Sequence, residues 1–140
     1  MFTCTWASSE ERAHPDPKLT PGAVVSADPN VACRWDKTPR FGGSASLKIS
    51  MEKSVFSAYG IPYSQHSDFE FDHFYPRCLG GVDTADNLWP QPCTVWGRYS
   101  CKVGQAADKD HDEDRICREI CVSHTLSLEE GKAELDAKWR

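Results

Sequence analysis

The residues most able to do chemistry lie in the segment 69–92, which reads FEFDHFYPRCLGGVDTADNLWPQP. An aspartate and a histidine, Asp72 and His73, stand next to each other in it. A carboxylate binds a hard cation such as Mg²⁺, and an imidazole with an unperturbed pKa of about 6.5 can take a proton from water at neutral pH. A cation beside the imidazole polarises a phosphoryl oxygen and stabilises the leaving oxyanion. The pair therefore predicts metal-assisted hydrolysis.

The pair must be positioned by a strand that leads into a loop. Alternation over residues 69–74 predicts a strand with the two phenylalanines on one face, and with Glu70 and Asp72 on the other. At the end of the strand the alternation breaks, so Asp72 and His73 can both turn toward one pocket. Glu70 shares the face of Asp72, and is either a carboxylate that supports a metal ligand or an exposed strand residue.

A glycine-containing loop follows the pair, over residues 78–87. Asn87 ends this loop, and its side-chain amide can tie together the segment that carries His73. The next three residues, 88–90, predict a short strand or anchor, because Pro90 prevents a long strand.

The rest of the chain predicts mostly helices. Apolar spacing predicts a helix from about Ser50 to Tyr59 with Ser50 as N-cap, and helices over about 105–122 and 128–139. Ser127 with Glu130 forms a capping box at the start of the last one.

The N-terminal part predicts less regular structure. The polar, proline-containing residues 1–22 are expected to form a flexible arm, and 23–140 one domain. Residues 23–48 predict short strands and turns, with Val31-Ala32-Cys33 among the apolar pieces.

The segment 69–92 resembles the HNH endonucleases of the His-Me finger (ββα-metal) superfamily. That family has Asp-His on a first strand, a Gly-Gly loop, and Asn-Leu leading toward a helix. The members with Leu-Trp-Pro after the Asn are most similar, and the resemblance spans roughly residues 20–140. It implies an α+β fold, in which a small ββα-metal core is flanked by additional helices and short strands.

The resemblance also implies roles for individual residues. His73 resembles the general base that activates water, Asp72 a ligand of the catalytic divalent metal, and Asn87 the residue that positions the catalytic loop. We expect the metal to be Mg²⁺, with Mn²⁺ or Zn²⁺ as alternatives.

A second metal ligand, His or Asn, stands on the following helix in that family. Aligning Lys109-Asp110 with the family places Ala107 at this position. His111, one turn further on the same helical face, is our candidate ligand, and Asp108 is the alternative.

The helix expected over 105–122 carries an acidic run, DKDHDEDRICRE at 108–119, with six acidic and three basic residues. Its acidic spacing imitates a calcium-binding loop, but Glu113 stands where that loop needs glycine. The run is instead a solvated helix face, or some of its carboxylates help to hold the catalytic metal. The candidates for contacts with substrate phosphates are Arg77 and Lys102, together with Arg98, Arg115 and Arg118.

Seven cysteines, an odd number, leave at least one thiol unpaired within a monomer. Three alternatives stay open: disulfides in an exported protein, a zinc site at 93, 101, 117 and 121, or buried reduced thiols. The cysteine content favours a secreted or periplasmic protein. The first residues hold no apolar signal-peptide core, so the chain is intracellular or has lost its signal peptide.

Composition sets limits on the class of protein. The 140 residues fit one domain, and the net charge of −5 disfavours a protein that binds nucleic acid through a basic surface. We therefore expect a metal-dependent endonuclease of low sequence specificity that acts on DNA, with RNA as a further candidate substrate. The alternative is a catalytically inactive protein of the same fold that binds nucleic acid, a protein partner or structural zinc.

Overall fold

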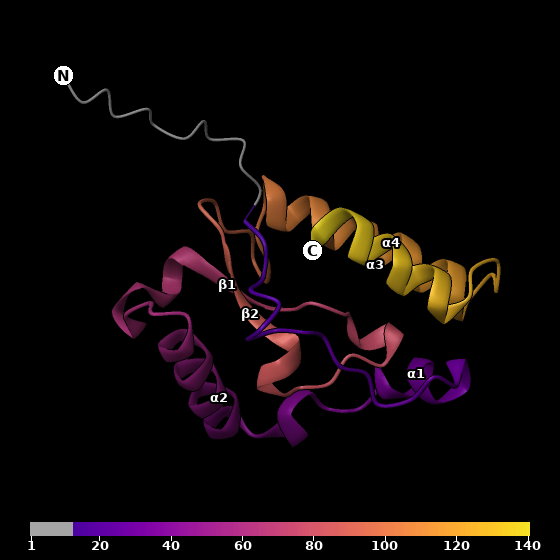
Figure 1. Ribbon diagram of the computed structural model, residues 1–140, viewed down its shortest axis with the longest axis horizontal. Helices are drawn as coiled ribbons and strands as arrows, with labels where there is room; N and C mark the ends of the chain where they lie inside the picture. Colours follow the sequence, from indigo (N-terminus) through magenta and orange to yellow (C-terminus); the bar gives the residue numbers. More distant parts are fainter. Residues whose placement is uncertain (1–12) are drawn as a thin grey trace.

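The computed structural model describes residues 13–140, which form a small mixed domain of helices and strands (Figure 1). Two strands make one antiparallel sheet, and short 3-10 turns join the larger elements. In chain order, the helices and strands are α1 (Pro29–Trp35), α2 (Ala45–Ala58), β1 (Phe69–His73), β2 (Leu88–Pro92), α3 (Gln105–Cys121) and α4 (Leu128–Trp139). The architecture is compatible with the expected α+β class.

The two-stranded sheet sets the direction of the polar side chains in the centre. Glu70 pairs with Gln91 and Asp72 pairs with Trp89, so these four residues share one face of the sheet. The predicted alternation is confirmed, because Phe71 packs instead with the cluster of Phe41, Val55 and Leu88.

Helices cover the sheet from two sides (Figure 1). α2 contacts β2 through a face that contains the buried Val55 and Phe56. The other long helix, α3, also contacts β2. α3 and α4 lie side by side, and their buried residues join the main core around Trp89. The sheet and its loop are therefore held between separate helical supports.

Gly131, a residue that disfavours helix, lies within α4 where this helix packs closely against α3. A Cβ on Gly131 would lie 2.9 Å from side-chain atoms of both Ile116 and Ile120. The glycine therefore permits the two helices to approach. The predicted bounds of α3 and α4 agree with the structure to within a residue, and the Ser127 capping box is present.

Three N-terminal predictions differ from the structure. The segment Val31-Ala32-Cys33 lies in helix α1, because Asp28 caps the helix and Pro29 occupies its first turn. Helix α2 begins at Ala45 rather than near Ser50, because the hydroxyl of Ser44 accepts a hydrogen bond from Leu47 N–H.

Residues 13–22 also differ from a flexible arm. Thr20 is buried and donates to the Leu88 carbonyl (3.1 Å), and Gly22 N–H donates to the Asp86 carbonyl (2.8 Å). This stretch therefore packs on the domain. Residues 1–12 of the expected arm lie outside the described residues.

Six of the cysteines form three disulfides, Cys33–Cys121, Cys78–Cys117 and Cys93–Cys101. The zinc-site alternative is wrong, because its four cysteines are divided among these three bonds. Cys4 lies outside the described residues.

Three disulfides indicate an oxidising, extracellular type of compartment. Among residues 13–140, none of the helices has the length and apolar character needed to cross a membrane.

Candidate metal centre and its cleft

A cleft of about 590 Å³ opens where β1, the loop after it and α3 meet. Its lining includes Asp72 and His73 from β1, and Asp110 and Glu113 from α3. The motif residues and the acidic helix therefore border one cavity, although they are separated by more than thirty positions in the sequence.

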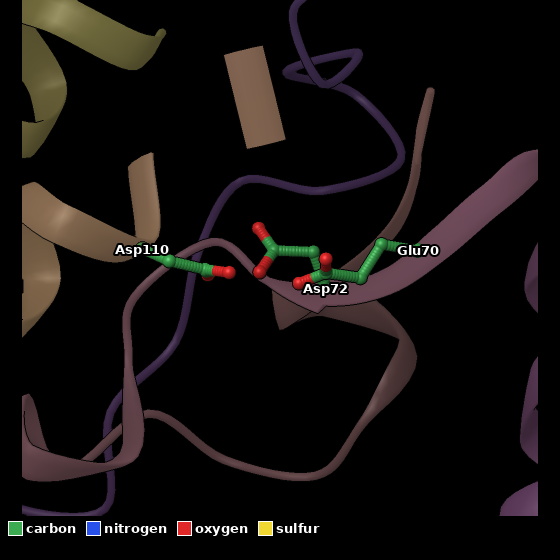
Figure 2. A group of neighbouring side chains, drawn as sticks. All are labelled: Glu70, Asp72 and Asp110. Carbon is green, nitrogen blue, oxygen red and sulfur yellow. The ribbon is translucent and has the colours of Figure 1, made fainter. Parts of the chain in front are cut away.

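Three carboxylates meet in this cleft (Figure 2). One oxygen each of Glu70, Asp72 and Asp110 lies within 4.8 Å of the others. The first two come from β1 and the third from the first half of α3, and all three point toward one another. An all-oxygen set of this kind suits hard divalent cations such as Mg²⁺, Mn²⁺ or Ca²⁺.

Hydrogen bonds fix the two strand carboxylates. Trp89 Nε1–H donates to Asp72 Oδ2 (3.0 Å), and Cys101 N–H donates to Glu70 Oε2 (2.9 Å). Each carboxylate is thus held from outside the acidic cluster, and its orientation does not depend on a bound ion.

Lys109 supplies a positive charge beneath the cluster. Its side chain is 0 % exposed, and its Nζ donates to Asp72 Oδ2 (2.8 Å), to the His73 carbonyl (2.9 Å) and to Glu113 Oε1. Burial alone would lower the pKa of Lys109, but the carboxylates of Asp72 and Glu113 raise it above its usual value. Lys109 therefore stays an ammonium ion and binds the strand to α3.

One ammonium does not balance the carboxylates around it. Burial, followed by the charges of Glu70 and Asp72, raises the pKa of Asp110 to about 7. Burial also raises the pKa of Glu70, and burial together with the charge of Asp72 raises the pKa of Glu113 against the opposing effect of Lys109. Full ionisation of the cluster would leave an excess of negative charge, and a bound divalent cation would neutralise it.

A buried amide lies on the same sheet face as the cluster. Gln91, opposite Glu70 in the register, is 0 % exposed, and neither its amide oxygen nor its nitrogen has a hydrogen-bond partner among the described residues. Unpaired buried polar atoms are rare in folded proteins, and a buried water or ion is one explanation for them. Gln91 does not line the cleft, so the fit to a hard cation rests on the three carboxylates.

His73 is oriented by an aspartate from the loop. Its Nε2 lies 2.7 Å from Asp83 Oδ1. Burial alone would raise the pKa of Asp83, but the hydrogen bond with His73 and the Phe41 N–H hold it below its usual range. The ionised carboxylate accepts only, so the imidazole carries its hydrogen on Nε2, and Nδ1 is the ring atom free to accept a proton.

Arg77 lines the cleft, but its guanidinium is committed to the protein. The residue is 3 % exposed and donates to the Thr38 carbonyl (2.6 Å) and to Thr38 Oγ1 (2.8 Å). It lies over the Trp35 ring, and its Nε is 3.4 Å from Asp83 Oδ1. Arg77 therefore supports the His73–Asp83 pair and, buried in this way, is poorly placed for the expected phosphate contact.

Asn87 ties the loop as expected. It is 0 % exposed; its amide nitrogen donates to the carbonyls of Tyr75 (3.0 Å) and Val82 (3.1 Å), and its oxygen accepts from Tyr75 N–H (3.0 Å). Asn87 is absent from the lining of the cleft and positions the loop without touching its contents. Gly81 is required in the same loop, because a Cβ there would lie 1.8 Å from the Tyr75 carbonyl oxygen.

The other expected residues lie away from the carboxylates. His111 is exposed on α3 and does not line the cleft, because the neighbouring Asp110 occupies the inward-facing position. Asp108 and Lys102 are exposed and likewise absent from the lining. The calcium-loop pattern lies within the continuous helix α3, which cannot form the loop it imitates.

Sequence reasoning singled out neither Asp83 nor Lys109 as a site residue, and it covered Asp110 only through the alternative that some carboxylates of 108–119 help to hold the metal. Helical spacing contains part of the signal, because Ala106, Asp110, Glu113 and Cys117 follow the i, i+4, i+7, i+11 pattern of one face. For Asp83 there is no comparable periodic signal, since a turn of the loop brings it back to His73.

Comparison of the chain with protein-family models, with curated proteins and with solved structures found no match.

Proposed function

We propose that this protein is a metal-dependent endonuclease that hydrolyses phosphodiester bonds of DNA or RNA. The observation that carries the proposal is the meeting of the Glu70, Asp72 and Asp110 carboxylates with the His73–Asp83 pair in one cleft. Its core would correspond to a ββα-metal arrangement formed by β1, β2 and α3.

The three carboxylates would hold the cation. The cation, when bound, would polarise a phosphoryl oxygen and stabilise the departing 3′-oxygen. Lys109 keeps Asp72 in place by donating to its Oδ2, and the remaining oxygen of that carboxylate stays available to the cation.

His73 would act as the general base. Asp83 holds the imidazole in the form whose Nδ1 carries the lone pair, and stabilises the imidazolium that forms when a water gives up its proton. The arrangement needs no nucleophile from the protein, so the product would form by direct attack of water on phosphorus.

A substrate phosphate would meet a basic side chain at the rim. Arg40 lines the cleft and is exposed, in contrast to the buried Arg77. Because the chain is acidic overall, contacts of this type would give modest affinity and little sequence preference. With its three disulfides, the enzyme would act as a secreted or periplasmic nuclease.

A plasmid-nicking assay with Mg²⁺ or Mn²⁺ tests the proposal. Replacement His73→Ala should lower the rate by roughly 10²- to 10⁴-fold, the usual contribution of a general base. His66→Ala is the matched control, because His66 is an exposed histidine outside the cleft and should leave the rate unchanged. Equal nicking by the His73→Ala variant and the wild type would contradict the assigned base. Absence of cleavage with either ion, both of the plasmid and of a single-stranded DNA, would contradict the proposed function.

A further inference from the structure

The segment 93–101, here called the cystine loop, is a rigid projection beside the cleft. The Cys93–Cys101 bond closes it, and both cysteines are buried with Ala106. Within the loop, Gly97 N–H donates to the Ser100 carbonyl (2.7 Å), and Trp96 Nε1–H donates to the Ser67 carbonyl (2.7 Å). The loop therefore holds a defined shape without burying its tip.

The tip of the cystine loop presents an aromatic ring and a cation to solvent. Tyr99 is 83 % exposed, and the Arg98 guanidinium lies 5.1 Å from the centroid of its ring. Lys102, just after the loop, is also exposed. A rigid exposed ring with cations beside it has the composition of single-strand binding surfaces, where bases stack on aromatic side chains and cations follow the backbone.

The cystine loop is continuous with the candidate metal centre. Tyr99 and Ser100 line the same cleft as Asp72, His73 and Asp110. In addition, Cys101 N–H donates to the Glu70 carboxylate (2.9 Å). A strand lying over the tip of the loop would therefore lead directly into the cleft.

Electrostatics favours an unpaired strand over a duplex. The net charge of −5 and the acidic cleft give little long-range attraction for the dense phosphates of a double helix. Stacking on Tyr99 supplies affinity that does not depend on charge, but it requires a base that is not already stacked inside a duplex.

Resting on the proposed nuclease function, we propose that Tyr99 is a stacking platform for an unpaired base. The substrate would then be single-stranded nucleic acid, with Tyr99 holding a base beside the scissile phosphate and Arg98 contacting the backbone. Tyr99 would be a specificity-determining residue that selects unpaired strands without contacting the reacting atoms.

Binding can be measured apart from cleavage by fluorescence anisotropy of the full chain, with its disulfides intact and Ca²⁺ present. The probes are a 12-nucleotide DNA single strand, its RNA counterpart, the same DNA as a duplex, and an abasic single strand with equal phosphate charge. The DNA and RNA arms distinguish the two sources of an unpaired base. The wild type should bind a single strand with bases roughly 5- to 100-fold more tightly than the abasic strand, the range given by one stacked base.

Variants assign this preference to the ring. Tyr99→Leu should abolish the difference between the base-containing and abasic strands, and Tyr99→Phe should retain it. Tyr63→Ala is the control, because Tyr63 lies outside the cleft and stacks on His66. A Tyr99→Leu variant that keeps the preference, or that weakens all four probes equally, would overturn the stacking role.

The two proposals can fail separately. Plasmid nicking that depends on His73, combined with unchanged strand preference in Tyr99→Leu, would leave the nuclease standing and overturn the platform. Strand binding that depends on Tyr99 without cleavage under any divalent ion would retain the platform and overturn the nuclease. No binding to any of the four probes would overturn the platform.

Discussion

At Asp110, the proposed metal binding would oppose the stability of the metal-free fold. The pKa of Asp110 is raised to about 7, so the metal-free fold favours the protonated form. In an unfolded chain the same group titrates near ~3.9. As the pH rises between these two values, the unfolded chain ionises while the folded protein still holds its proton. The free energy of unfolding therefore falls with rising pH, and the loss is complete above pH 7.

Replacement Asp110→Asn should therefore raise the melting temperature of the metal-free protein at pH 8 by several degrees, and should change it little at pH 3. The same replacement removes one of three carboxylates and should weaken Mn²⁺ binding, measured by calorimetry, by roughly 10-fold or more. The control is Asp108→Asn, an exposed neighbour on α3 that should affect neither quantity. A lower melting temperature for Asp110→Asn at pH 8 would contradict the destabilising effect of the ionised Asp110 carboxylate.

Loss of Lys109 should lower the free energy of unfolding of the metal-free protein substantially. Replacement Lys109→Met keeps the length of the side chain but leaves buried carboxylates without their ammonium, which typically destabilises a fold by ~3–5 kcal/mol. Because a dication can replace part of the missing charge, Mn²⁺ should stabilise this variant more than it stabilises the wild type. Urea unfolding with and without Mn²⁺ measures both effects, and equal stabilisation of the two proteins by Mn²⁺ would show that Lys109 and the ion do not share the site.

At the scale of the residue, the sequence predicted the strand part of the candidate site better than the helix part. Asp72 and His73 can be recognised from the sequence because they are adjacent and of the residue types that the chemistry needs. Strand alternation then placed Glu70 on the same face as Asp72. The position of Asp110 depends on which face α3 turns to the sheet, and a helix rotated by one residue would have presented His111 instead. The burial of Lys109, Ile116 and Ile120 sets how α3 is rotated about its axis. A short sequence motif carries no information about that burial.

At the scale of the element, the cystine loop connects a disulfide to a candidate ligand. Cys101 N–H orients Glu70, and Cys93–Cys101 fixes the position of Cys101. Replacing both cysteines with serine should free the loop and weaken Mn²⁺ binding about threefold to tenfold. The control is Thr94→Ser, at an exposed position of the loop outside the cleft lining, which leaves the disulfide in place. Unchanged Mn²⁺ affinity in the Cys variant would show that the loop does not orient Glu70.

Elements with strong local signals were predicted, and those set by distant contacts were not. Periodicity and the Ser127 cap gave α3 and α4 close to their bounds, because these signals act within one turn of helix. Residues 13–22 carry no such signal, since their order comes from contacts with residues such as Leu88, far along the chain. The short α1 was missed because its Asp28-Pro29 start resembles a turn as much as a helix cap.

At the scale of the whole molecule, the disulfides hold α3 against the parts that carry the other candidate ligands. Cys78–Cys117 joins the middle of α3 to the loop after β1, and Cys33–Cys121 joins its end to α1. The helix that supplies Asp110 is thereby fixed relative to the strand that supplies Glu70 and Asp72. These covalent bonds oppose the repulsion among the carboxylates of the cleft.

The three disulfides should contribute unequally to stability. Chain-entropy arguments give about 4–5 kcal/mol for a loop as long as that of Cys33–Cys121, about 4 for Cys78–Cys117, and about 2.5 for Cys93–Cys101. Paired replacements with alanine, measured by urea unfolding without metal, should follow this order. For Mn²⁺ affinity the order should differ, because Cys93–Cys101 holds the residue whose N–H orients the candidate ligand Glu70, whereas Cys33–Cys121 lies outside the cleft. If both quantities fell in parallel across the three variants, the cystine loop would have no role beyond general stability.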